Sequence, residues 1–150
     1  MNDFINLKKI QEKLALNNWS LYEYQKEFLK YQSQKKFRQI LISSEIGTGK
    51  TITAFLPFFK NEINKTKKKV IYISPLKSIN TTLKERLTEL SLNLGIKCKI
   101  EKRTSDISYI TKKKQLFNVP DILLTTPESL TLMIANANAT SLLENTDYFI

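Results

Sequence analysis

The segment Ser44–Thr51, which reads Ser-Glu-Ile-Gly-Thr-Gly-Lys-Thr, limits the fold of this chain more than any other part of the sequence. It follows an apolar run over 39–42 and leads directly into a second apolar run over 51–56. A strand, a tight loop with glycines and a helix in this order are typical of a phosphate-binding loop. The sequence therefore predicts a strand over 39–43, a phosphate loop over 44–51 and a helix over 50–62.

The residue types in this loop suit phosphate binding for physical reasons. Gly47 and Gly49 permit backbone dihedrals that a β-carbon forbids, so backbone N–H groups can surround phosphate oxygens. The ammonium group of Lys50 would reach the β- and γ-phosphates, and the hydroxyl of Thr51 would coordinate Mg²⁺. The N-terminus of the following helix favours anions. The predicted nucleotide-binding residues of the loop are Ser44, Glu45, Ile46, Gly47, Thr48, Gly49, Lys50 and Thr51.

One position departs from the motif G-x-x-x-x-G-K-[ST], because Ser44 stands where the first glycine is expected. A small residue can serve there, so the departure weakens the motif only slightly. The alternative is a glycine-rich turn between a strand and a helix that binds nothing. The chain has only three glycines, and two of them are Gly47 and Gly49. This concentration favours nucleotide binding.

Short apolar runs alternate with helical patterns along the rest of the chain. The other predicted strands are 70–74, 96–101, 121–125 and the run that begins at Tyr148. The other predicted helices are 3–15, one that begins with Ser20 as its cap, 78–92, 107–117, 128–135 and a short piece over 140–144. Short, continuously apolar strands are typical of a parallel sheet that helices cover on both faces. The predicted fold class is therefore α/β.

The loops that follow the strands are predicted to share one edge of this sheet. Right-handed crossovers bring the carboxyl ends of parallel strands together, and ligands bind there. The three loops with suitable chemistry, 44–51, 74–77 and 125–129, all follow predicted strands. We therefore expect them to lie side by side.

The charge of the chain supports a polyanionic partner only in combination with the motifs. A net charge of +10 and a sequence pI of about 9.6 favour such partners. However, the Lys-rich runs at 65–69 and 112–114 are more typical of solvated loops or helix ends than of residues that read bases.

Length and cysteine usage indicate the class of protein. A chain of 150 residues is long enough for one compact domain with a sizeable core. The single cysteine, Cys98, excludes an internal disulfide and suits a reducing compartment. No apolar run approaches the ~20 residues of a membrane-spanning helix. The sequence predicts a cytoplasmic protein without a membrane partner, in which Cys98 is a half-buried strand residue.

Five segments follow one another along the chain: Trp19–Gln25, Gly47–Thr51, Tyr72–Asn80, Arg103–Asp106 and Asp121–Leu130. In this order they resemble the Q motif, motif I, motif Ia, the Thr-Gly-Asp segment and motif Ib of superfamily 2 helicases. The resemblance is closest to the large helicase-related (Lhr-type) proteins of the DEAD/DEAH-box type. One departure is Ser105, which replaces the glycine of the Thr-Gly-Asp segment.

The resemblance implies an ATP site with Mg²⁺. In such a site Gln25 would grip the edge of the adenine, and either Trp19 or Tyr22 would pack near the base. Lys50 and Thr51 would be the catalytic residues that this chain contributes, with Thr51 as the metal ligand.

The resemblance also implies contacts with the sugar-phosphate backbone of single-stranded or partly duplex nucleic acid. Helix N-termini after Pro75 and Pro127 would offer free N–H groups to phosphates. Such contacts read no sequence, so binding should be salt-sensitive, and DNA and RNA both remain open. The predicted contact residues are Ser74, Pro75, Leu76, Lys77, Arg103, Thr104, Thr125, Thr126, Pro127 and Glu128.

By the same resemblance, residues 1–37 are N-terminal helices with the segment like the Q motif, and residues 38–150 are the first RecA-like ATP-binding domain. This RecA-like half is expected to be incomplete, because the Asp-Glu pair of motif II would begin about two residues beyond Ile150. Asp121 and Asp147 do not replace that pair, since each begins its strand rather than ending it. A second RecA-like domain is expected in the intact protein.

The sequence thus predicts the N-terminal part of an ATP-dependent helicase, which moves on or unwinds nucleic acid when intact. The isolated chain is predicted to bind ATP without turning it over. Two alternatives stay open. One is a helicase-like motor of a restriction or remodelling complex, and the other is a catalytically inert, truncated module for binding nucleic acid or a partner.

Overall fold

The computed structural model describes residues 2–16, 19–33, 39–63, 66–144 and 146–150. Their contacts divide the chain into two compact units. The first comprises residues 1–67 with 92–96, and the second comprises residues 68–91 with 97–150. The predicted domain boundary between residues 37 and 38 lies outside the described residues.

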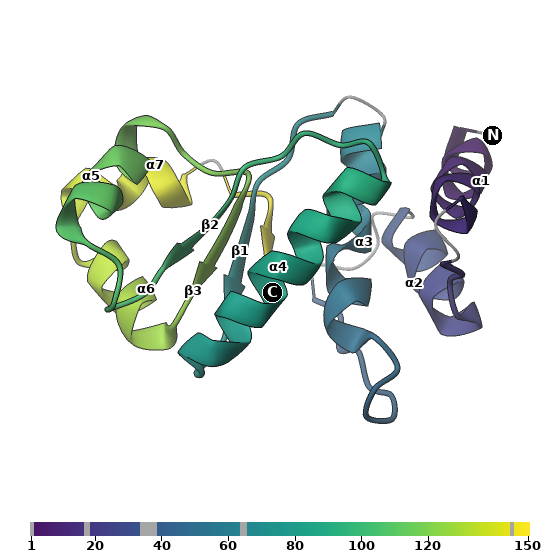
Figure 1. The fold of residues 1–150 in the computed structure, drawn as a ribbon, viewed down its shortest axis with the longest axis horizontal. Coiled ribbons are helices and arrows are strands. Elements are labelled where there is room, and N and C mark those ends of the chain that lie inside the picture. The colour runs from purple at the N-terminus through teal and green to yellow at the C-terminus, as the bar shows by residue number, and fades with distance from the viewer. Residues whose placement is uncertain (1, 17–18, 34–38, 64–65, 145) are drawn as a thin grey trace. The chain divides into compact units, whose positions relative to one another are not determined.

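The first unit is built from three helices that contact one another: α1 (Asn2–Ala15), α2 (Glu23–Ser33) and α3 (Lys50–Ile63) (Figure 1). Residues 55–59 of α3 are buried, and the rings of Phe58 and Phe59 meet edge to face with their centroids 5.3 Å apart. Pro57 lies inside α3, as the sequence predicted. The helix that follows the phosphate loop, α3, is therefore held in place by its packing within the first unit.

The predicted start of the second helix at Ser20 is wrong, because α2 begins at Glu23. The Gln25 side chain explains this start: its Oε1 accepts a hydrogen bond of 3.0 Å from the backbone N–H of Tyr22. A glutamine three residues into a helix that bonds back to the preceding N–H is one half of a capping box. Ser20 precedes this box, so it does not cap the helix.

The predicted strand over 39–43 is also wrong. Residues 39–45 form neither helix nor strand. Leu41 is 93% exposed and Ile40 is 45% exposed, so this apolar run is not buried as a central strand would be. A strand is defined by hydrogen bonds to a neighbouring strand. The four strands of the described sheet pair with one another, and the run over 39–43 is not among them.

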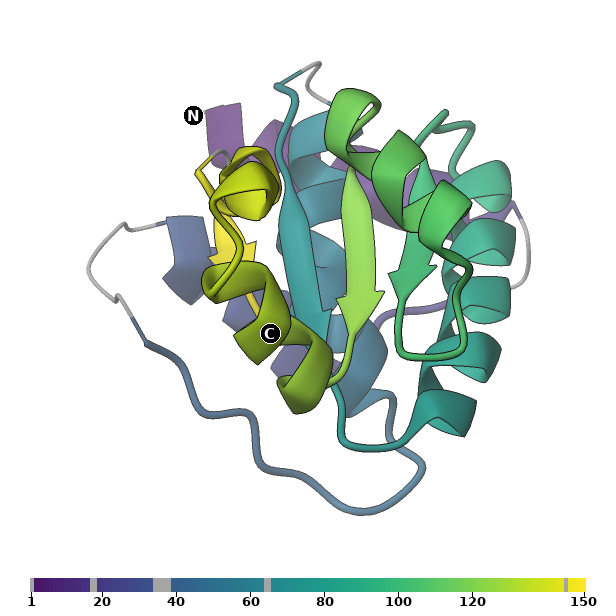
Figure 2. The same ribbon diagram turned by 90° about the vertical axis from the view of Figure 1, so that its left-hand side faces the viewer.

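The second unit contains a four-stranded, entirely parallel sheet with the order β2-β3-β1-β4 (Figures 1 and 2). The strands are β1 (Val70–Ile73), β2 (Ile100–Arg103), β3 (Ile122–Thr125) and β4 (Tyr148–Phe149). All four residues of β3 are buried, as expected for a central strand between two neighbours. The predicted α/β class with a parallel sheet is confirmed.

One strand starts later than predicted. The run from residue 96 was expected to be extended throughout, but β2 begins only at Ile100. Its sole described partner, β3, begins at Ile122, which is the residue opposite Ile100. A ladder cannot extend beyond the end of its partner, so Cys98 is half-buried in the preceding loop rather than in a strand.

Helices lie on both faces of the sheet in the second unit (Figures 1 and 2). One face is covered by α5 (Tyr109–Phe117), α6 (Pro127–Ile134) and α7 (Thr140–Leu143), with a short 3₁₀ helix over Ala137–Ala139. The opposite face carries α4 (Lys77–Asn93), which belongs to this unit over residues 77–91. These helices match the predicted ones to within a few residues at their ends.

The core under α6 and α7 is a cluster of buried side chains from the sheet and these helices: Ile71, Leu123, Met133, Ala139 and Leu142. On the other face, α4 buries Leu83, Leu87 and Leu90, the three leucines that recur at helical spacing. The two clusters fix the sheet from both sides. Of the helices in the described parts of the chain, none combines the length and apolar character of a bilayer span.

Candidate functional site

The phosphate loop has the backbone conformation that its glycines predict. Gly47 has φ of 85° and Gly49 has φ of 81°, the left-handed region that side chains with a β-carbon rarely adopt. A β-carbon at Gly47 would meet nothing within 4 Å, whereas one at Gly49 would lie 3.3 Å from Nε2 of Gln25. The α3 helix begins directly afterwards, at Lys50. The loop therefore delivers the chain into a helix N-terminus, as a phosphate cradle requires.

Hydrogen bonds inside the loop give a role to its unusual serine. The Ser44 hydroxyl lies 2.6 Å from Oγ1 of Thr48, and Thr48 in turn donates to the carbonyl of Glu45 at 2.8 Å. Because Thr48 has a single hydroxyl proton, Ser44 is the donor of the first bond. A glycine at position 44 would lack this bond, so the departure from the motif contributes to closing the loop.

The Lys50 ammonium group lies within the mouth of the loop. Its Nζ donates to the carbonyl oxygens of Ser44 and Glu45, both at 2.6 Å. Thr51 is exposed beside it, and Ile46 is fully exposed at the tip of the loop. The cation and the hydroxyl predicted to meet phosphate and Mg²⁺ are thus at the same end of α3.

Two residues that the sequence analysis did not select, Tyr24 and Thr53, connect α2 to the phosphate loop. The Tyr24 hydroxyl donates to the carbonyl of Thr48 at 2.6 Å and lies 3.0 Å from Oγ1 of Thr53. Thr53 is completely buried, and its hydroxyl lies 2.9 Å from the carbonyl of Gly49. The sequence contained a signal for Thr53, because this polar residue interrupts an apolar run. A threonine in a helix can bond to the carbonyl four residues earlier, which here is that of Gly49.

Gln25 is buried beneath the loop. Its Nε2 donates to Oγ1 of Thr53 at 2.9 Å, while its Oε1 accepts from the N–H of Tyr22. The role of Gln25 at an adenine edge stays a prediction. The same holds for the choice between Trp19 and Tyr22, of which Tyr22 stacks on Tyr24 with ring centroids 6.1 Å apart.

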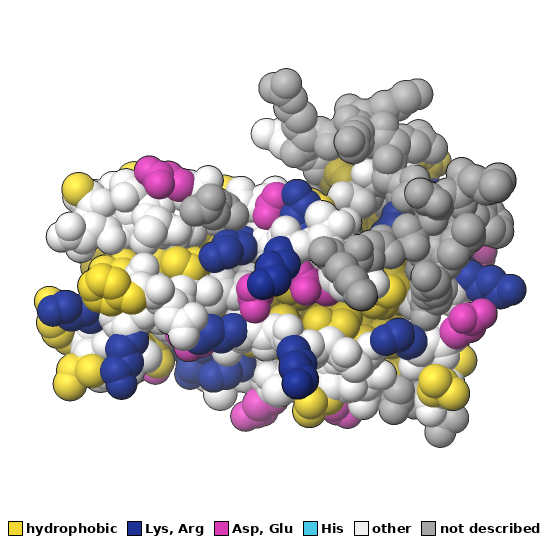
Figure 3. Space-filling view, turned by 90° about the horizontal axis from the view of Figure 1, so that it is seen from above, with side chains coloured by type: hydrophobic (Ala, Val, Ile, Leu, Met, Phe, Trp, Pro, Cys, Tyr) yellow, Lys and Arg dark blue, Asp and Glu magenta, His cyan; other side chains and the backbone are white. Residues whose placement is uncertain are grey.

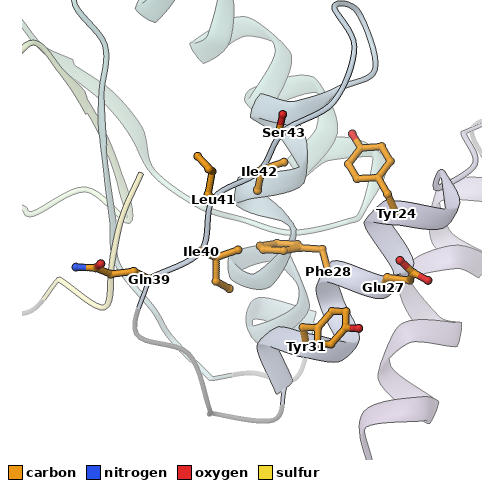
Figure 4. A pocket seen from close by; sticks show the side chains of 9 residues that line it. All are labelled: Tyr24, Glu27, Phe28, Tyr31, Gln39, Ile40, Leu41, Ile42 and Ser43. Atoms are coloured by element: carbon orange, nitrogen blue, oxygen red, sulfur yellow. The ribbon is translucent and has the colours of Figure 1, made fainter.

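A pocket of about 440 Å³ lies between α2 and the extended segment before the loop (Figure 4). In Figure 4 the side chains of Phe28 and Ile40 point toward one another within it. Its wall is largely apolar and aromatic, and neither Trp19 nor Tyr22 contributes to it. The lining residues are Tyr24, Glu27, Phe28, Tyr31, Gln39, Ile40, Leu41, Ile42 and Ser43.

In the second unit, three strands end at the same level. Ile73 of β1 and Arg103 of β2 both lie opposite Thr125 of β3. The loops over 74–77 and 125–129 therefore share one edge of the sheet, as predicted. We call residues 74–77, 103–106 and 125–129 the strand-end edge. The phosphate loop belongs to the other unit, so its predicted place beside these loops stays a prediction.

Thr125 is the junction of the strand-end edge. Its carbonyl accepts hydrogen bonds from the N–H of Ser74 and from Nδ2 of Asn80, both at 3.0 Å. Its hydroxyl donates to the carbonyl of Arg103 at 2.7 Å. Asn80 is fully buried and was missed as a site residue, although it lies in the segment that resembles motif Ia. These bonds connect all three strand ends through one residue.

Nine of the ten residues predicted to contact nucleic acid fall into two groups by exposure, and the tenth, Arg103, is half-buried. The hydroxyl-bearing residues are buried: Ser74, Thr104, Thr125 and Thr126. The exposed residues are Pro75, Leu76, Lys77, Pro127 and Glu128. Thr126 caps α6 by accepting from the N–H of Ser129. The buried group therefore shapes the edge, and the exposed group forms its outer surface.

The Arg103 guanidinium is bonded to α5. Its Nη1 donates to the carbonyl of Lys112 at 2.8 Å and to Oε1 of Gln115 at 3.0 Å. Partial burial lowers the pKa of Arg103 from its ordinary value. These bonds hold α5 against the end of β2, and a contact between Arg103 and nucleic acid stays a prediction.

Two carboxylates at the strand-end edge have a pKa below the ordinary value. The pKa of Asp106 is lowered first by the hydrogen bond from the Thr104 hydroxyl. The pKa of Glu128 is lowered first by its own backbone N–H and then by the Thr126 hydroxyl. The charge of Lys77 lowers both values further.

The surface charge is mixed. On the face shown in Figure 3, Lys and Arg side chains are interspersed with Asp and Glu rather than forming one continuous basic patch. The basic side chains on this face therefore do not mark a binding site by themselves.

Among the residues that the structure describes, no group of three or more His, Cys, Asp or Glu side chains is placed to hold a metal ion. Mg²⁺ in nucleotide sites commonly takes one or two protein ligands, with phosphate oxygens and waters completing its octahedron. The exposed hydroxyl of Thr51 fits such a contribution. A role of Thr51 as a magnesium ligand stays a prediction.

Known proteins that resemble this chain in sequence or fold are helicases. A sequence profile of the DEAD/DEAH box helicase family matches residues 22–150. The ATP-dependent helicase Lhr-Core of Sulfolobus acidocaldarius is 38% identical over 122 residues, which cover 68% of this chain and 13% of that protein. The chain spans 13–16% of the length of the Lhr-Core helicases that it matches.

Two solved helicase structures share the fold. The DUF1998 helicase MrfA bound to DNA and AMPPNP gives a TM-score of 0.80 at 23% identity, over 94% of this chain and 20% of that one. The Mycobacterium smegmatis helicase Lhr bound to ssDNA and AMP-PNP gives a TM-score of 0.77 at 22% identity, over 88% of this chain and 18% of that one. At these identities the likeness supports the fold alone.

Proposed function

The chain belongs to the DEAD/DEAH box helicase family, and we propose on this premise that it is the ATP-binding and nucleic-acid-binding N-terminal part of an ATP-dependent helicase. The family membership confirms the resemblance found in the sequence. The observation that carries the proposal is the phosphate loop, in which two glycines with positive φ lead into Lys50 at the start of a buried helix. The intact protein would couple ATP hydrolysis to movement on nucleic acid.

The phosphate loop is proposed to hold the triphosphate of ATP. Lys50 would exchange its two carbonyl partners for phosphate oxygens, which are stronger acceptors for an ammonium group. Thr51 would provide one ligand to Mg²⁺, and the metal would neutralise charge on the phosphates. The cradle is formed by backbone N–H groups at the start of α3.

The strand-end edge is proposed to hold the sugar-phosphate backbone of DNA or RNA. Helix α4 begins at this edge, at Lys77, so the N–H groups of its first turn and the exposed Lys77 ammonium are available there. Helix α6 also begins at this edge, but the N–H groups of Glu128 and Ser129 are already bonded within the helix start. Two structural neighbours carry DNA together with AMPPNP or AMP-PNP, which supports this assignment by analogy. Binding of this kind is independent of sequence and weakens with salt.

The 150-residue chain alone is proposed to bind ATP without turning it over. Hydrolysis in this class of enzyme needs carboxylates that hold the metal and orient the attacking water. Among the described residues, no group of three or more His, Cys, Asp or Glu side chains could hold a metal ion. A second RecA-like domain and a cytoplasmic location are part of the same proposal, the latter supported by a single cysteine, Cys98, which cannot form an internal disulfide.

The proposal is tested with the full-length protein. A fluorescent ATP analogue should bind and be displaced by unlabelled ATP, and ATP hydrolysis should rise when single-stranded DNA or RNA is added. Affinity for a labelled single strand should fall steeply as salt is increased, with little dependence on base sequence. Failure to bind the analogue at millimolar protein and Mg²⁺ would contradict the proposal.

A further inference from the structure

We propose that the outer face of α5 is a docking site for an acidic, amphipathic helix of another protein. The outer face comprises Ile110, Lys113, Lys114 and Phe117. These four residues lie on one side of α5 because an α-helix has about 3.6 residues per turn. The docking site is separate from the proposed ATP and nucleic-acid sites and depends on neither of them.

Helix α5 is attached to the sheet mainly by polar bonds. Its one buried residue is Gln115, whose Nε2 donates to the carbonyl of Lys102 at 2.9 Å and whose Oε1 accepts from Arg103. Arg103 also donates to the carbonyl of Lys112 at 2.8 Å. Among the apolar residues of the helix, Leu116 packs half-buried against the core under α6 and α7. The rest of the apolar surface of α5 is therefore not needed to hold it in place.

Two large apolar side chains of α5 are on the outside of the protein. Ile110 is 67% exposed and Phe117 is 83% exposed. They are seven residues apart, so they lie on the same side of the helix, about 10.5 Å from each other along its axis. Figures 1 and 2 show α5 at the outer surface of the second unit. A surface helix normally turns its apolar stripe toward the core, so this reversed arrangement indicates a surface that another molecule covers.

The charge of the outer face indicates the chemistry of that molecule. Lys113 and Lys114 stand between the two apolar residues in sequence, and both are exposed. The chain has no acidic residue between Asp106 and Asp121. Within the described residues, neither lysine forms an ion pair. A partner helix with carboxylates beside an apolar stripe would pair with both lysines while it covers the apolar side chains.

A second copy of the chain and a nucleic acid fit this face less well. In a two-fold contact of the face with itself, lysines would oppose lysines and repel. Phe117 lies at the end of α5 away from the strand-end edge. The neighbouring Asn118 carbonyl accepts from Nζ of Lys99 at 2.6 Å, and Lys99 directly precedes the start of β2. The aliphatic side chain of Ile110 has neither a charge for phosphates nor a ring for bases.

The test uses the full-length protein and a fluorescently labelled synthetic peptide. The peptide has about 18 residues, enough for a helix, with leucines along one face and glutamates elsewhere. A scrambled peptide of the same composition is the control ligand. Ile110→Ser and Phe117→Ser remove the apolar contacts, and Leu92→Ser is their matched control, since Leu92 is 72% exposed on α4. Fluorescence anisotropy at low salt measures affinity, and thermal melting checks that each variant is folded.

A second pair of variants tests the charge. Lys113→Glu combined with Lys114→Glu reverses the charge of the outer face, and Lys67→Glu combined with Lys97→Glu makes the same change of net charge at two other exposed lysines. The wild type should bind the peptide with a Kd on the order of 10–100 µM, because the contact is small. The serine variants on α5 and the reversed face should each weaken binding about tenfold. Both controls should stay within about twofold of the wild type.

A charge-swapped peptide makes the test sharper. When its glutamates are replaced by lysines, the peptide should bind the reversed face better than it binds the wild type. No binding of the acidic peptide to the wild type would overturn the proposal, as would equal binding of the scrambled peptide or equal losses in the control variants. A dimer in sedimentation that Phe117→Ser abolishes would assign the face to a second copy instead. Loss of affinity for anionic lipid vesicles or for a labelled single strand in Phe117→Ser, with the peptide unbound, would assign it to lipid or nucleic acid.

Discussion

The phosphate loop and the strand-end edge are both proposed to bind phosphates, but different bonds hold them in shape. The loop depends on side chains, because Tyr24, Ser44 and Thr53 each bond to its backbone or to its hydroxyls. The edge depends on the sheet, because its loops start where parallel ladders end in register at Thr125.

This difference predicts how each site responds to substitution. Removing the hydroxyl of Tyr24, for example, should release the carbonyl of Thr48 to which it donates. Removing one side chain from the edge leaves the ladder bonds of β1, β2 and β3 intact. Binding of nucleotide should therefore be sensitive to single substitutions, while binding of nucleic acid should respond gradually.

The largest effect is expected for Lys50→Ala. The ammonium group is the only cation bonded inside the described loop, and charge-assisted bonds to phosphate are strong. Loss of about 3 kcal/mol, or roughly 100-fold in ATP affinity, should follow. Titration with a fluorescent ATP analogue measures it, and Lys67→Ala on an exposed lysine is the control. Equal ATP affinity in Lys50→Ala and Lys67→Ala would contradict the expectation that the loop is the more sensitive of the two sites.

The next effect compares the two loop glycines. Gly49→Ala and Gly47→Ala both pay about 1 kcal/mol for a positive φ. Only the β-carbon at position 49 meets a neighbour, Nε2 of Gln25 at 3.3 Å. ATP affinity should therefore fall further in Gly49→Ala than in Gly47→Ala. The opposite order in a binding titration would show that Gln25 does not pack against the loop in solution.

A smaller effect is expected at the strand-end edge for Asn80→Ala. The variant loses the bond from Nδ2 to the Thr125 carbonyl, and this carbonyl keeps its bond from Ser74. The free energy of unfolding should fall by about 1–2 kcal/mol, with less than about tenfold loss of single-strand affinity. Denaturant unfolding and fluorescence anisotropy measure these, with the exposed Thr82→Ala as control. A complete loss of single-strand affinity in Asn80→Ala would contradict the expectation that the strand-end edge tolerates single substitutions.

The smallest effect is a pH dependence at Glu128. Its pKa is lowered in the folded protein, so its stabilising contribution is present above the ordinary Glu value and is lost as pH falls through the lowered pKa. Wild type should be slightly more stable than Glu128→Gln at pH 7, and the difference should vanish in acid. Thermal melting across pH tests this, with Glu89→Gln as control, and a difference that grows in acid would refute it.

The sequence predicted the elements whose pattern is decided locally. The apolar runs of β1 and β3 are continuous, and α4 carries leucines at helical spacing, so their boundaries were correct to within a few residues. The glycines of the phosphate loop also predicted its backbone correctly, because positive φ is a property of a single residue.

The sequence could not predict features that depend on a distant partner. The run at 39–43 has the composition of a strand, but only pairing with a neighbour would make it one. Likewise, β2 starts at Ile100 because its partner β3 starts at the opposite residue. The bonds of Gln25 to Thr53 and of Asn80 to Thr125 join residues 28 and 45 positions apart. Nothing local distinguishes such a glutamine or asparagine from an exposed one.

The central position of β3 has a kinetic consequence. Its neighbours β1 and β2 precede it in the chain, and no ladder joins them to each other. During synthesis both strands must wait, with the apolar residues of β1 uncovered, until the residues around Leu124 leave the ribosome and the long connections can close. The helices of the first unit need no such delay, so a chaperone that binds the nascent chain should be engaged mainly between the appearance of β1 and that of β3.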